Sequence, residues 1–316
     1  MTAAKFFTHP LGIFGASVSA TLLWGSSYPF IKLSYARLGI GSSDTLQQLL
    51  FAGYRFTLAG LLILAYMVIR RESLRYQRGS GGMVSSIAML QTVLQYTFFY
   101  AGLSMSAGVA GAVISGTISF FQIVLAHFIY RDDRISGAKG AGLLVGFIGL
   151  LVLGIAKHDG GAGGLHFSAG ELLLMAATLF NAFANLLSKR AAATLSVSYI
   201  NGYQMLLGGI VLSLIAAGGV GWTPFHFDGI GLLMLLHLAV VSALAFTLWN
   251  NVMKYNRVGS VSMYLFLIPV FGVLQSALFL HEALSAAVLA ALALVSAGIV
   301  IVNRGRRQAA RTLTEE

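Results

Sequence analysis

The sequence has no cysteine, only four prolines, and only 10 acidic side chains against 20 basic ones in 316 residues. Without cysteine, the chain has no disulfide, no thiolate metal site and no cysteine nucleophile. Charged residues make up 9% of the composition, whereas hydrophobic residues make up 57% and the mean hydropathy is +0.83. These values exclude a soluble domain of this length and predict an all-α integral membrane protein.

Ten apolar stretches follow one another along the chain, each close to the ~20 residues that cross about 30 Å of hydrocarbon. They cover residues 11–33, 46–69, 83–104, 107–129, 136–156, 169–188, 198–218, 229–251, 259–280 and 284–303. The first stretch has no small-residue cleavage site, so it is expected to remain as a span instead of being removed as a signal peptide. We therefore predict ten transmembrane helices.

Basic residues lie almost entirely on one side of this pattern. With the N-terminus in the cytoplasm, the cytoplasmic segments hold 16 of the 20 Lys and Arg residues, and the external segments hold only Arg37 and Lys157. Because short loops rich in Lys and Arg stay in the cytoplasm, both termini are predicted to be cytoplasmic. These charges flank membrane spans, so the lipid bilayer is their expected partner and nucleic-acid binding is not expected.

The two halves of the chain resemble each other at an offset near 150 residues. Residues 54–60 align with 203–209, Thr97 with Thr247, Phe99 with Trp249, Asp132 with Glu282, and Gly142 with Ala291. With five spans in each half, the second half enters the membrane inverted, an arrangement that places a substrate site at the midplane and permits alternating access. We predict a first repeat at 1–156, a glycine-rich linker at 157–168, a second repeat at 169–303 and a basic cytoplasmic tail at 304–316.

Several motifs carry a resemblance to a known family. Trp24-Gly25-Ser26-Ser27 resembles the W-G-S signature that opens EamA-type members of the drug/metabolite transporter superfamily. Arg55-Phe56 followed by Ala59-Gly60, Pro269-Val270-Phe271, and His281-Glu282-Ala283-Leu284-Ser285 are similar to further hallmarks of that family. The resemblance implies a ten-helix carrier in the bacterial cytoplasmic (inner) membrane, with two inverted repeats, a central cavity and a small metabolite, often an exported amino acid, as substrate.

The sequence departs from the family pattern in one respect that bears on mechanism. The first repeat has Ser119 where the second has Pro269, and it has Arg131-Asp132-Asp133 where an acidic-basic pair is usual. The fourth and ninth helices are therefore not expected to be mechanically equivalent.

Polar and aromatic side chains inside the spans are the candidates for a wet cavity. Gln91 and Gln95 lie four residues apart, as do Asn181 and Asn185, so each pair shares one helix face. Hydrogen bonds between helices would satisfy such groups without any transport role, but their spread over both halves favours a central cavity. The predicted substrate-binding residues are Trp24, Tyr28, Arg55, Gln91, Gln95, Tyr96, Ser119, Asn181, Trp249 and Tyr264.

Two prolines inside spans are the predicted helix hinges. Pro29 displaces the carbonyl of Gly25, four residues back, and Pro269 displaces that of Leu265. An opened helix beside a cavity exposes backbone polar groups to a ligand. The alternative is that each proline only kinks its helix.

Arg55 is the one strongly basic side chain well inside a span, and an intramembrane charge is a functional hypothesis. It either binds a substrate carboxylate, or snorkels, or pairs with Asp44, Glu171 or Glu282. The first interpretation predicts that the solute is an amino acid or a related zwitterion or anion, and export is what the family resemblance implies. The aromatic residues would instead suit a quaternary amine or another organic cation.

Other classes of protein lack support in the sequence. It contains no mid-span carboxylate and no His-Glu-x-x-His motif, so an enzyme, a metal site or a cofactor is not expected. A channel or a non-transporting scaffold remains an alternative. Gly142 and Gly146 are interpreted as contacts for helix packing or for a homodimer.

The charge distribution makes a direct prediction about topology. We expect reporters fused after Arg75, after Lys189 and at the C-terminus to report a cytoplasmic location, because basic loops stay inside. Reporters in the 158–165 segment and near Asp228 should report an external one. Protease protection and fluorescence of the fusions measure this, and an external C-terminus would contradict the ten-span arrangement.

Overall fold

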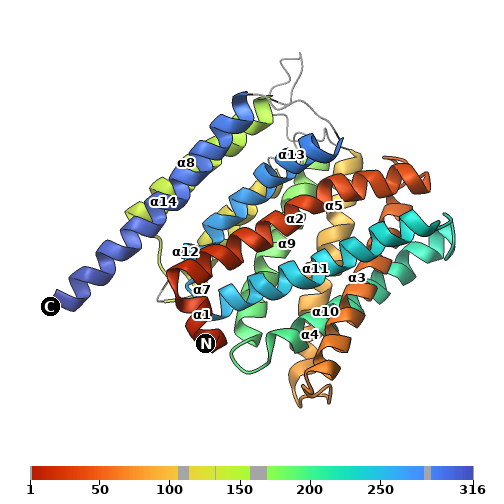
Figure 1. Cartoon of the computed structure of the whole chain (residues 1–316), viewed down its shortest axis with the longest axis horizontal. Coiled ribbons are helices and arrows are strands. Elements are labelled where there is room, and N and C mark those ends of the chain that lie inside the picture. Colours follow the sequence, from red (N-terminus) through yellow and green to blue (C-terminus); the bar gives the residue numbers. More distant parts are fainter. Residues whose placement is uncertain (1, 106–113, 132, 157–168, 281–285, 316) are drawn as a thin grey trace.

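The computed structural model describes residues 2–105, 114–131, 133–156, 169–280 and 286–315, and these are helical with no strand among them (Figure 1). The elements are α1 (Ala3–Thr8), α2 (Pro10–Leu38), α3 (Thr45–Ile69), α4 (Ser80–Ile87), the π-helix η1 (Ala88–Leu94), α5 (Gln95–Ser104), α7 (Ile118–Ile129), α8 (Gly137–Ala156), α9 (Ala169–Ala191), α10 (Val197–Val220), α11 (Gly229–Tyr255), α12 (Val258–Val261), the 3-10 helix η2 (Ser262–Phe266), α13 (Leu267–Leu280) and α14 (Ala286–Glu315).

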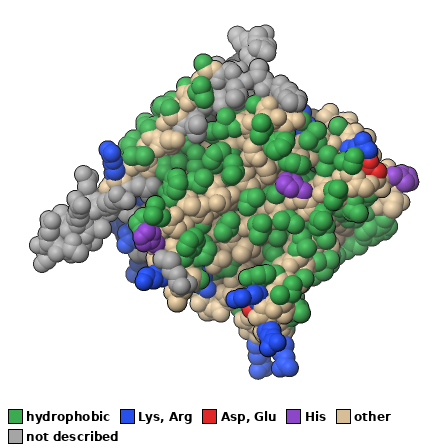
Figure 2. Space-filling view, viewed as in Figure 1, with side chains coloured by type: hydrophobic (Ala, Val, Ile, Leu, Met, Phe, Trp, Pro, Cys, Tyr) green, Lys and Arg blue, Asp and Glu red, His purple; other side chains and the backbone are tan. Residues whose placement is uncertain are grey.

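Among the described residues, five helical stretches are long and apolar enough to cross a membrane. They are α3, α9, α10, α11 and the stretch Val258–Leu280 formed by α12, η2 and α13. Large apolar side chains such as Leu61, Leu214 and Leu233 point outward from these helices. Hydrophobic side chains cover the centre of the face seen in Figure 2, and Lys and Arg gather at its margins. This is the surface expected of a protein that lies in lipid.

The predicted spans coincide with helices, with three differences. The third span is not one regular helix, because the π-helix η1 separates α4 from α5. The ninth consists of α12, η2 and α13 in succession, and the predicted cytoplasmic tail is helical because α14 continues to Glu315. Residues 107–113, the predicted start of the fourth span, and the 157–168 linker lie outside the described residues.

The helices of the two halves have corresponding neighbours. In the first half, α2 packs against α11 and α13; in the second half, α9, which occupies the matching place in sequence, packs against α5 and α7. The pairs α3 with α10 and α8 with α14 each join matching helices, and α8 and α14 lie side by side along one edge in Figure 1. Exchanging the halves therefore leaves this set of contacts unchanged.

Four glycines bring α3 and α10 into backbone contact. A Cβ on Gly60 would lie 2.5 Å from the backbone N of Leu206, and one on Gly209 would lie 2.3 Å from the backbone N of Thr57. Gly53 and Gly202 are similarly close to the opposite helix. Small residues allow this approach, which gives van der Waals contact that apolar lipid cannot outcompete.

The α8–α14 pair uses glycines in the same way. A Cβ on Gly142 would lie 2.7 Å from the carbonyl oxygen of Gly298, and one on Gly298 would lie 3.1 Å from the backbone N of Gly146. A Cβ on Gly146 itself would lie 2.8 Å from the ring of Phe266 in η2. The sequence left open whether Gly142 and Gly146 serve helix packing or a homodimer. In the structure both pack within one chain.

An exposed ion pair joins the ends of α2 and α11. Arg37 donates to the carboxylate of Asp228, which also caps α11 by accepting from the backbone N of Gly231 at 2.7 Å. The bond from the Arg37 guanidinium lowers the pKa of the Asp228 carboxyl. An exposed pair of this kind contributes little to stability, so the helix contact itself must hold these ends together.

The glycine contact predicts different effects for the same substitution at two places in α10. Gly209→Ala should destabilise the protein by about 1–3 kcal/mol, because the new methyl group meets the α3 backbone. Gly218→Ala should leave stability unchanged or raise it, because nothing lies within 4 Å of its Cβ position and alanine favours helix. Melting temperatures in one detergent test this, and equal melting temperatures would contradict the close crossing.

Candidate functional site

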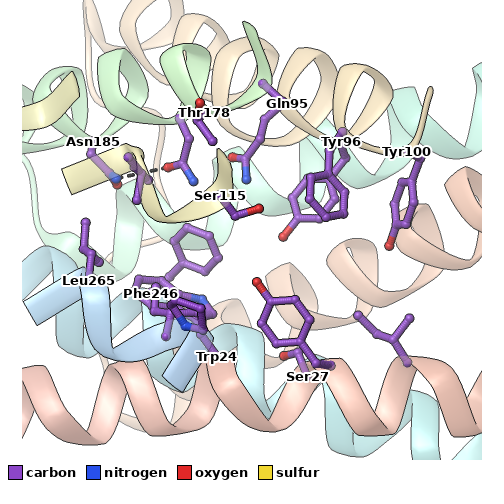
Figure 3. A pocket seen from close by; sticks show the side chains of 18 of the residues that line it. Trp24, Ser27, Gln95, Tyr96, Tyr100, Ser115, Thr178, Asn185, Phe246 and Leu265 are labelled. Atoms are coloured by element: carbon purple, nitrogen blue, oxygen red, sulfur yellow. Dashed lines mark hydrogen bonds between the residues drawn. The ribbon is translucent and has the colours of Figure 1, made fainter. Parts of the chain in front are cut away.

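A cavity of about 150 Å³ lies between helices of both halves. Its wall is formed by Trp24, Ser27, Tyr28, Ile31, Arg55, Gln95, Tyr96, Phe99, Tyr100, Ser115, Ile118, Ala177, Thr178, Asn181, Asn185, Phe246, Leu265, Ile268 and Pro269. In Figure 3, Trp24 and Phe246 lie on one side, with Gln95, Tyr96 and Ser115 on the other. Asn185 and Tyr100 mark opposite ends of this view.

The two halves contribute matching positions to this wall. Six pairs of lining residues have numbers that differ by 150: Ser27 and Ala177, Tyr28 and Thr178, Ile31 and Asn181, Tyr96 and Phe246, Ser115 and Leu265, and Ile118 and Ile268. The positions correspond, but in five of the six pairs the residue types differ. The two halves therefore contribute corresponding positions to the cavity wall, but the side chains at most of these positions differ in chemistry.

Aromatic rings form much of the apolar wall. Trp24 meets Phe246 edge to face with ring centroids 5.1 Å apart, and it meets Trp249 at 6.0 Å in the same manner. Tyr96 packs on Phe56 at 4.7 Å. These contacts fix the ring of Trp24 at the cavity surface, whereas Trp249 behind it is fully buried.

Arg55 is buried, with 3% of its surface exposed, so it does not snorkel. Its Nε donates to Ser242 Oγ at 2.7 Å and its Nη2 donates to Ser27 Oγ at 3.1 Å. Its guanidinium carbon lies 5.3 Å from the centroid of the Phe56 ring. All of these partners are neutral, and burying a charge is costly unless a charged partner or many hydrogen bonds compensate it.

No ion pair involving Arg55 is present in the part of the chain that the structure describes. The alternative that Arg55 pairs with Asp44 is not seen: the Asp44 carboxylate accepts from the backbone N of Gly41 at 2.9 Å and forms no ion pair with Arg55. Glu171 forms no ion pair with Arg55 either, and Glu282 lies outside the described residues.

The second half repeats the Arg55 contact with neutral groups. Gln204, which aligns with Arg55, accepts a hydrogen bond from Thr92 at 3.0 Å, and Thr92 matches Ser242 at an offset of 150. Both contacts run between the second helix of one half and the third helix of the other. The fold therefore accommodates a neutral residue at this position, so the positive charge of Arg55 is not needed to form this contact between helices.

Seven of the residues predicted from sequence line the cavity: Trp24, Tyr28, Arg55, Gln95, Tyr96, Asn181 and the predicted hinge Pro269. Pro269 lies in the first turn of α13, directly after the 3-10 helix η2, so the ninth span changes helix type next to this predicted hinge. A proline in a first turn removes no intrahelical hydrogen bond. The other predicted hinge, Pro29, lies within α2, which continues through it without a break.

The structure does not bring the remaining four predicted residues to the cavity wall. Gln91 bonds Asn185 at 2.9 Å, and Ser119 donates to the carbonyl oxygen of Ser262 at 2.9 Å. Trp249 and Tyr264 are buried in the core around α11 and η2. Their role in substrate binding remains a prediction.

Sequence reasoning did not select several lining residues, among them Ser27, Thr178 and Phe246. Ser27 follows Trp24 by three positions and Thr178 matches Tyr28 at the 150-residue offset, so the repeat itself carried the missing signal. Within the described ranges, no three His, Asp or Glu side chains gather as a metal site. The wall offers hydrogen bonds, aromatic faces and one charge, which suit binding rather than proton transfer.

The profile of the EamA-like transporter family matches the chain in two successive stretches, residues 10–155 and 168–304. "Uncharacterized transporter YvbV" of Bacillus subtilis (strain 168) is 25% identical over 287 residues, covering 89% of this chain and 88% of the relative. "Probable amino-acid metabolite efflux pump" of Salmonella typhimurium is 25% identical, covering 89% of this chain and 91% of the relative.

Two further comparisons add to this. "S-adenosylmethionine/S-adenosylhomocysteine transporter" of Chlamydia muridarum is 25% identical over 258 residues, covering 80% of this chain and 76% of the relative. A solved crystal structure with 21% sequence identity superposes with a TM-score of 0.75, covering 95% of this chain and 99% of its own. At this identity the superposition establishes the fold alone.

The two tryptophans give opposite predictions for truncation to alanine. Trp24→Ala should weaken substrate binding or flux while the melting temperature changes little, because Trp24 is partly exposed at the cavity. Trp249→Ala should lower stability by about 3–5 kcal/mol, because the ring is fully buried. Flux in proteoliposomes and thermal unfolding measure both effects. A destabilised Trp24→Ala protein with wild-type flux would assign Trp24 to the core.

Proposed function

The chain belongs to the EamA-like transporter family, and we propose that it carries a small zwitterionic or anionic metabolite, such as an amino acid, by alternating access. It is a membrane transporter. The observation that carries the proposed substrate class is Arg55, a buried cation at the wall of the cavity between the halves. A carboxylate on the solute is the partner that this charge favours.

The proposed alternating access rests on inverted repeats. The contacts of α2 with α11 and α13, of α9 with α5 and α7, and of the pairs α3–α10 and α8–α14 correspond when the halves are exchanged, and six pairs of cavity positions match at an offset of 150. Five spans in each half would turn the second half upside down, and such repeats rock against each other around a central site. The 16 to 2 distribution of basic residues supports cytoplasmic termini.

Contacts between the halves support a cavity that is closed toward the cytoplasm. The buried Asp133 carboxylate, in the segment after α7, accepts from the backbone N of Gly259 in the second half at 2.8 Å, and Lys139 of its own half also donates to it at 2.5 Å. Tyr130 donates to the carbonyl oxygen of Leu186 at 3.1 Å. In the proposed orientation these groups lie on the cytoplasmic side of the cavity. Opening toward the cytoplasm would have to break the hydrogen bonds from Gly259 to Asp133 and from Tyr130 to Leu186.

The names of the relatives agree with a solute that carries an amino-acid group. One relative is named for amino-acid metabolites, and another for S-adenosylmethionine and S-adenosylhomocysteine, which both contain an α-amino-acid group. The cavity of about 150 Å³ is below the roughly 300–1,000 Å³ of drug-sized sites. We therefore propose a compact solute and export across the cytoplasmic membrane of a bacterium.

An organic cation is the alternative that one observation favours, namely the aromatic side chains at the cavity wall. Arg55 lines the same small cavity and would repel a cation. A channel or a scaffold would lack saturable exchange. Counterflow in proteoliposomes separates these classes, because only a carrier accelerates uptake when solute is present on the opposite side.

The position of Arg55 at the cavity predicts that replacing it weakens the binding of solutes that carry a carboxylate, and of those solutes only. Arg55→Gln should weaken binding of amino acids by roughly 1.5–3 kcal/mol, the range for a hydrogen bond to a charged group. Decarboxylated analogues of the same amino acids should bind wild type and variant alike. Arg55→Lys should restore binding only in part, because an ammonium group cannot reproduce the two-pronged guanidinium. Ligand-induced shifts in melting temperature measure all three.

The variant has an internal precedent, because Gln204 occupies the matching position in the second half. A folded Arg55→Gln protein is therefore expected. If it loses its fold, or binds amino acids as wild type does, Arg55 is structural. If it gains affinity for choline without losing any for amino acids, the cation alternative is favoured.

A further inference from the structure

Four amide side chains gather where α9 faces η1 and α5. They are Gln91, Gln95, Asn181 and Asn185, and three of them form a chain of hydrogen bonds. Gln91 Nε2 donates to Asn185 Oδ1 at 2.9 Å, and Asn185 Nδ2 donates to Asn181 Oδ1 at 3.0 Å. In each link a nitrogen donates to the next carbonyl oxygen, so the chain runs from the buried Gln91 to Asn181 at the cavity wall.

This direction determines what the cavity wall presents. Because the Asn181 carbonyl oxygen is already an acceptor, its Nδ2 is left with two N–H groups and makes no hydrogen bond among the residues described. Gln95, on the facing helix, also lines the cavity, and its Oε1 is buried without a hydrogen-bond partner. The cavity wall thus offers a donor from the second half, and Gln95 of the first half carries an unpaired acceptor buried beside it.

The matching positions of the opposite repeat carry no such groups. Gln91 and Gln95 match Val241 and Ala245, which are apolar, at an offset of 150. Asn181 matches Ile31. At these positions, as at Arg55, the two halves carry different residue types. Because the matching positions of the other half are apolar, the fold shared by the two halves does not require these amides.

The backbone is also irregular at this place. The π-helix η1 spans Ala88–Leu94, so it contains Gln91 and ends directly before Gln95. The matching segment of the second half lies within the regular α-helix α11. Single π-helical turns are rare and are frequent at functional sites, where they shift side chains around the helix axis.

The amides and the charge occupy different ends of the cavity. Asn185 lies at one end in Figure 3, and Ser27 lies toward the other, where Tyr100 is found. Arg55 bonds Ser27, so its charge belongs to that second end. A solute that spans the cavity would meet a cation at one end and paired amide groups at the other.

We propose that the amide end is a subsite for a carboxamide, so that the preferred solute carries a carboxylate at one end and a carboxamide at the other. The carboxamide oxygen accepts from Asn181 Nδ2, and its N–H donates to Gln95 Oε1. A second carboxylate fits less well because it has no hydrogen to donate to Gln95. This specificity rests on the proposed function, with Arg55 holding the carboxylate.

Three probes separate the contributions: two of them, L-glutamine and L-glutamate, are of nearly equal size, and the third, N,N-dimethyl-L-glutamine, is larger by two methyl groups. The side chain of L-glutamine has both the carbonyl oxygen acceptor and the N–H donors of a carboxamide. L-Glutamate lacks the donors and adds a negative charge, and N,N-dimethyl-L-glutamine keeps the carbonyl oxygen but has no side-chain N–H. Affinities of the purified full-length chain, from ligand-induced shifts in melting temperature, should favour glutamine over each of the others by about three- to tenfold, the value of one hydrogen bond.

Variants at Asn181 test which group makes the difference. Asn181→Leu, which has a similar shape without polar atoms, should reduce the preference for glutamine to within about twofold of the glutamate affinity. Asn181→Asp keeps the size, removes the N–H donors and should lose the preference as well, which covers the case that the leucine variant does not fold. Asn251→Leu is the matched control, because Asn251 bonds the carbonyl oxygen of Thr247 in its own helix and does not line the cavity.

The outcomes separate the subsite from the proposed function. If wild type binds glutamine and glutamate equally, or if the Asn181 variants keep the full preference, the amide subsite is wrong. Loss of glutamate binding in Arg55→Gln would then still support the proposed function. If none of the three probes stabilises the wild-type protein, the amide subsite is wrong, whereas the proposed amino-acid class is wrong only if no other amino acid stabilises the protein either.

Discussion

The contact between α3 and α10 is the one on which the rest of the arrangement depends. In lipid there is no hydrophobic force to hold helices together, so their backbones must approach closely enough for van der Waals contact. Gly53 and Gly60 on α3, with Gly202 and Gly209 on α10, provide that approach. Because these are matching helices, the contact also sets one half of the chain against the other.

The same contact positions the polar groups next to it. Arg55 lies between the two glycines of α3, and Gln204 lies between the two glycines of α10. Each reaches a hydroxyl on the third helix of the opposite half, at 2.7 Å for Ser242 and 3.0 Å for Thr92. A buried polar group in a membrane must find such a partner within the protein. The two halves thus make corresponding contacts, Arg55 with Ser242 and Gln204 with Thr92, and only the first of these contacts involves a charged side chain.

Most of the fold follows from the sequence, because span length and basic loops are set by the physics of the bilayer. The interruptions are harder to anticipate. Ala88–Leu94 reads as an ordinary apolar helix, and nothing in its sequence marks it as a π-helix. Thr92, inside this segment, packs against α10, where its Cβ lies 2.5 Å from the position that a Cβ on Gly208 would occupy. The helical continuation of α14 beyond residue 303 was also missed, because its basic side chains indicate only the end of the span.

The cavity was predicted less completely than the fold. Residue type identified Trp24, Arg55 and Asn181, because charge, amide and large aromatic groups are conspicuous inside a span. It could not distinguish Trp249, which packs directly behind Trp24 and is fully buried. Which side of a helix faces a cavity depends on tertiary packing, and the correspondence between the halves was the only sequence signal that bore on it.

A fixed charge at the cavity has an electrical consequence. Arg55 places one positive charge at the site. In the proposed cycle an empty carrier therefore changes its facing direction with this charge uncompensated, and a carrier loaded with an anion changes it as a neutral pair. A membrane potential acts on a charge that crosses it with about 2.3 kcal/mol per 100 mV. The resting voltage of the cell would therefore bias the side to which the empty cavity opens. It would act much less on a carrier loaded with an anion than on one loaded with a zwitterion, which adds no net charge.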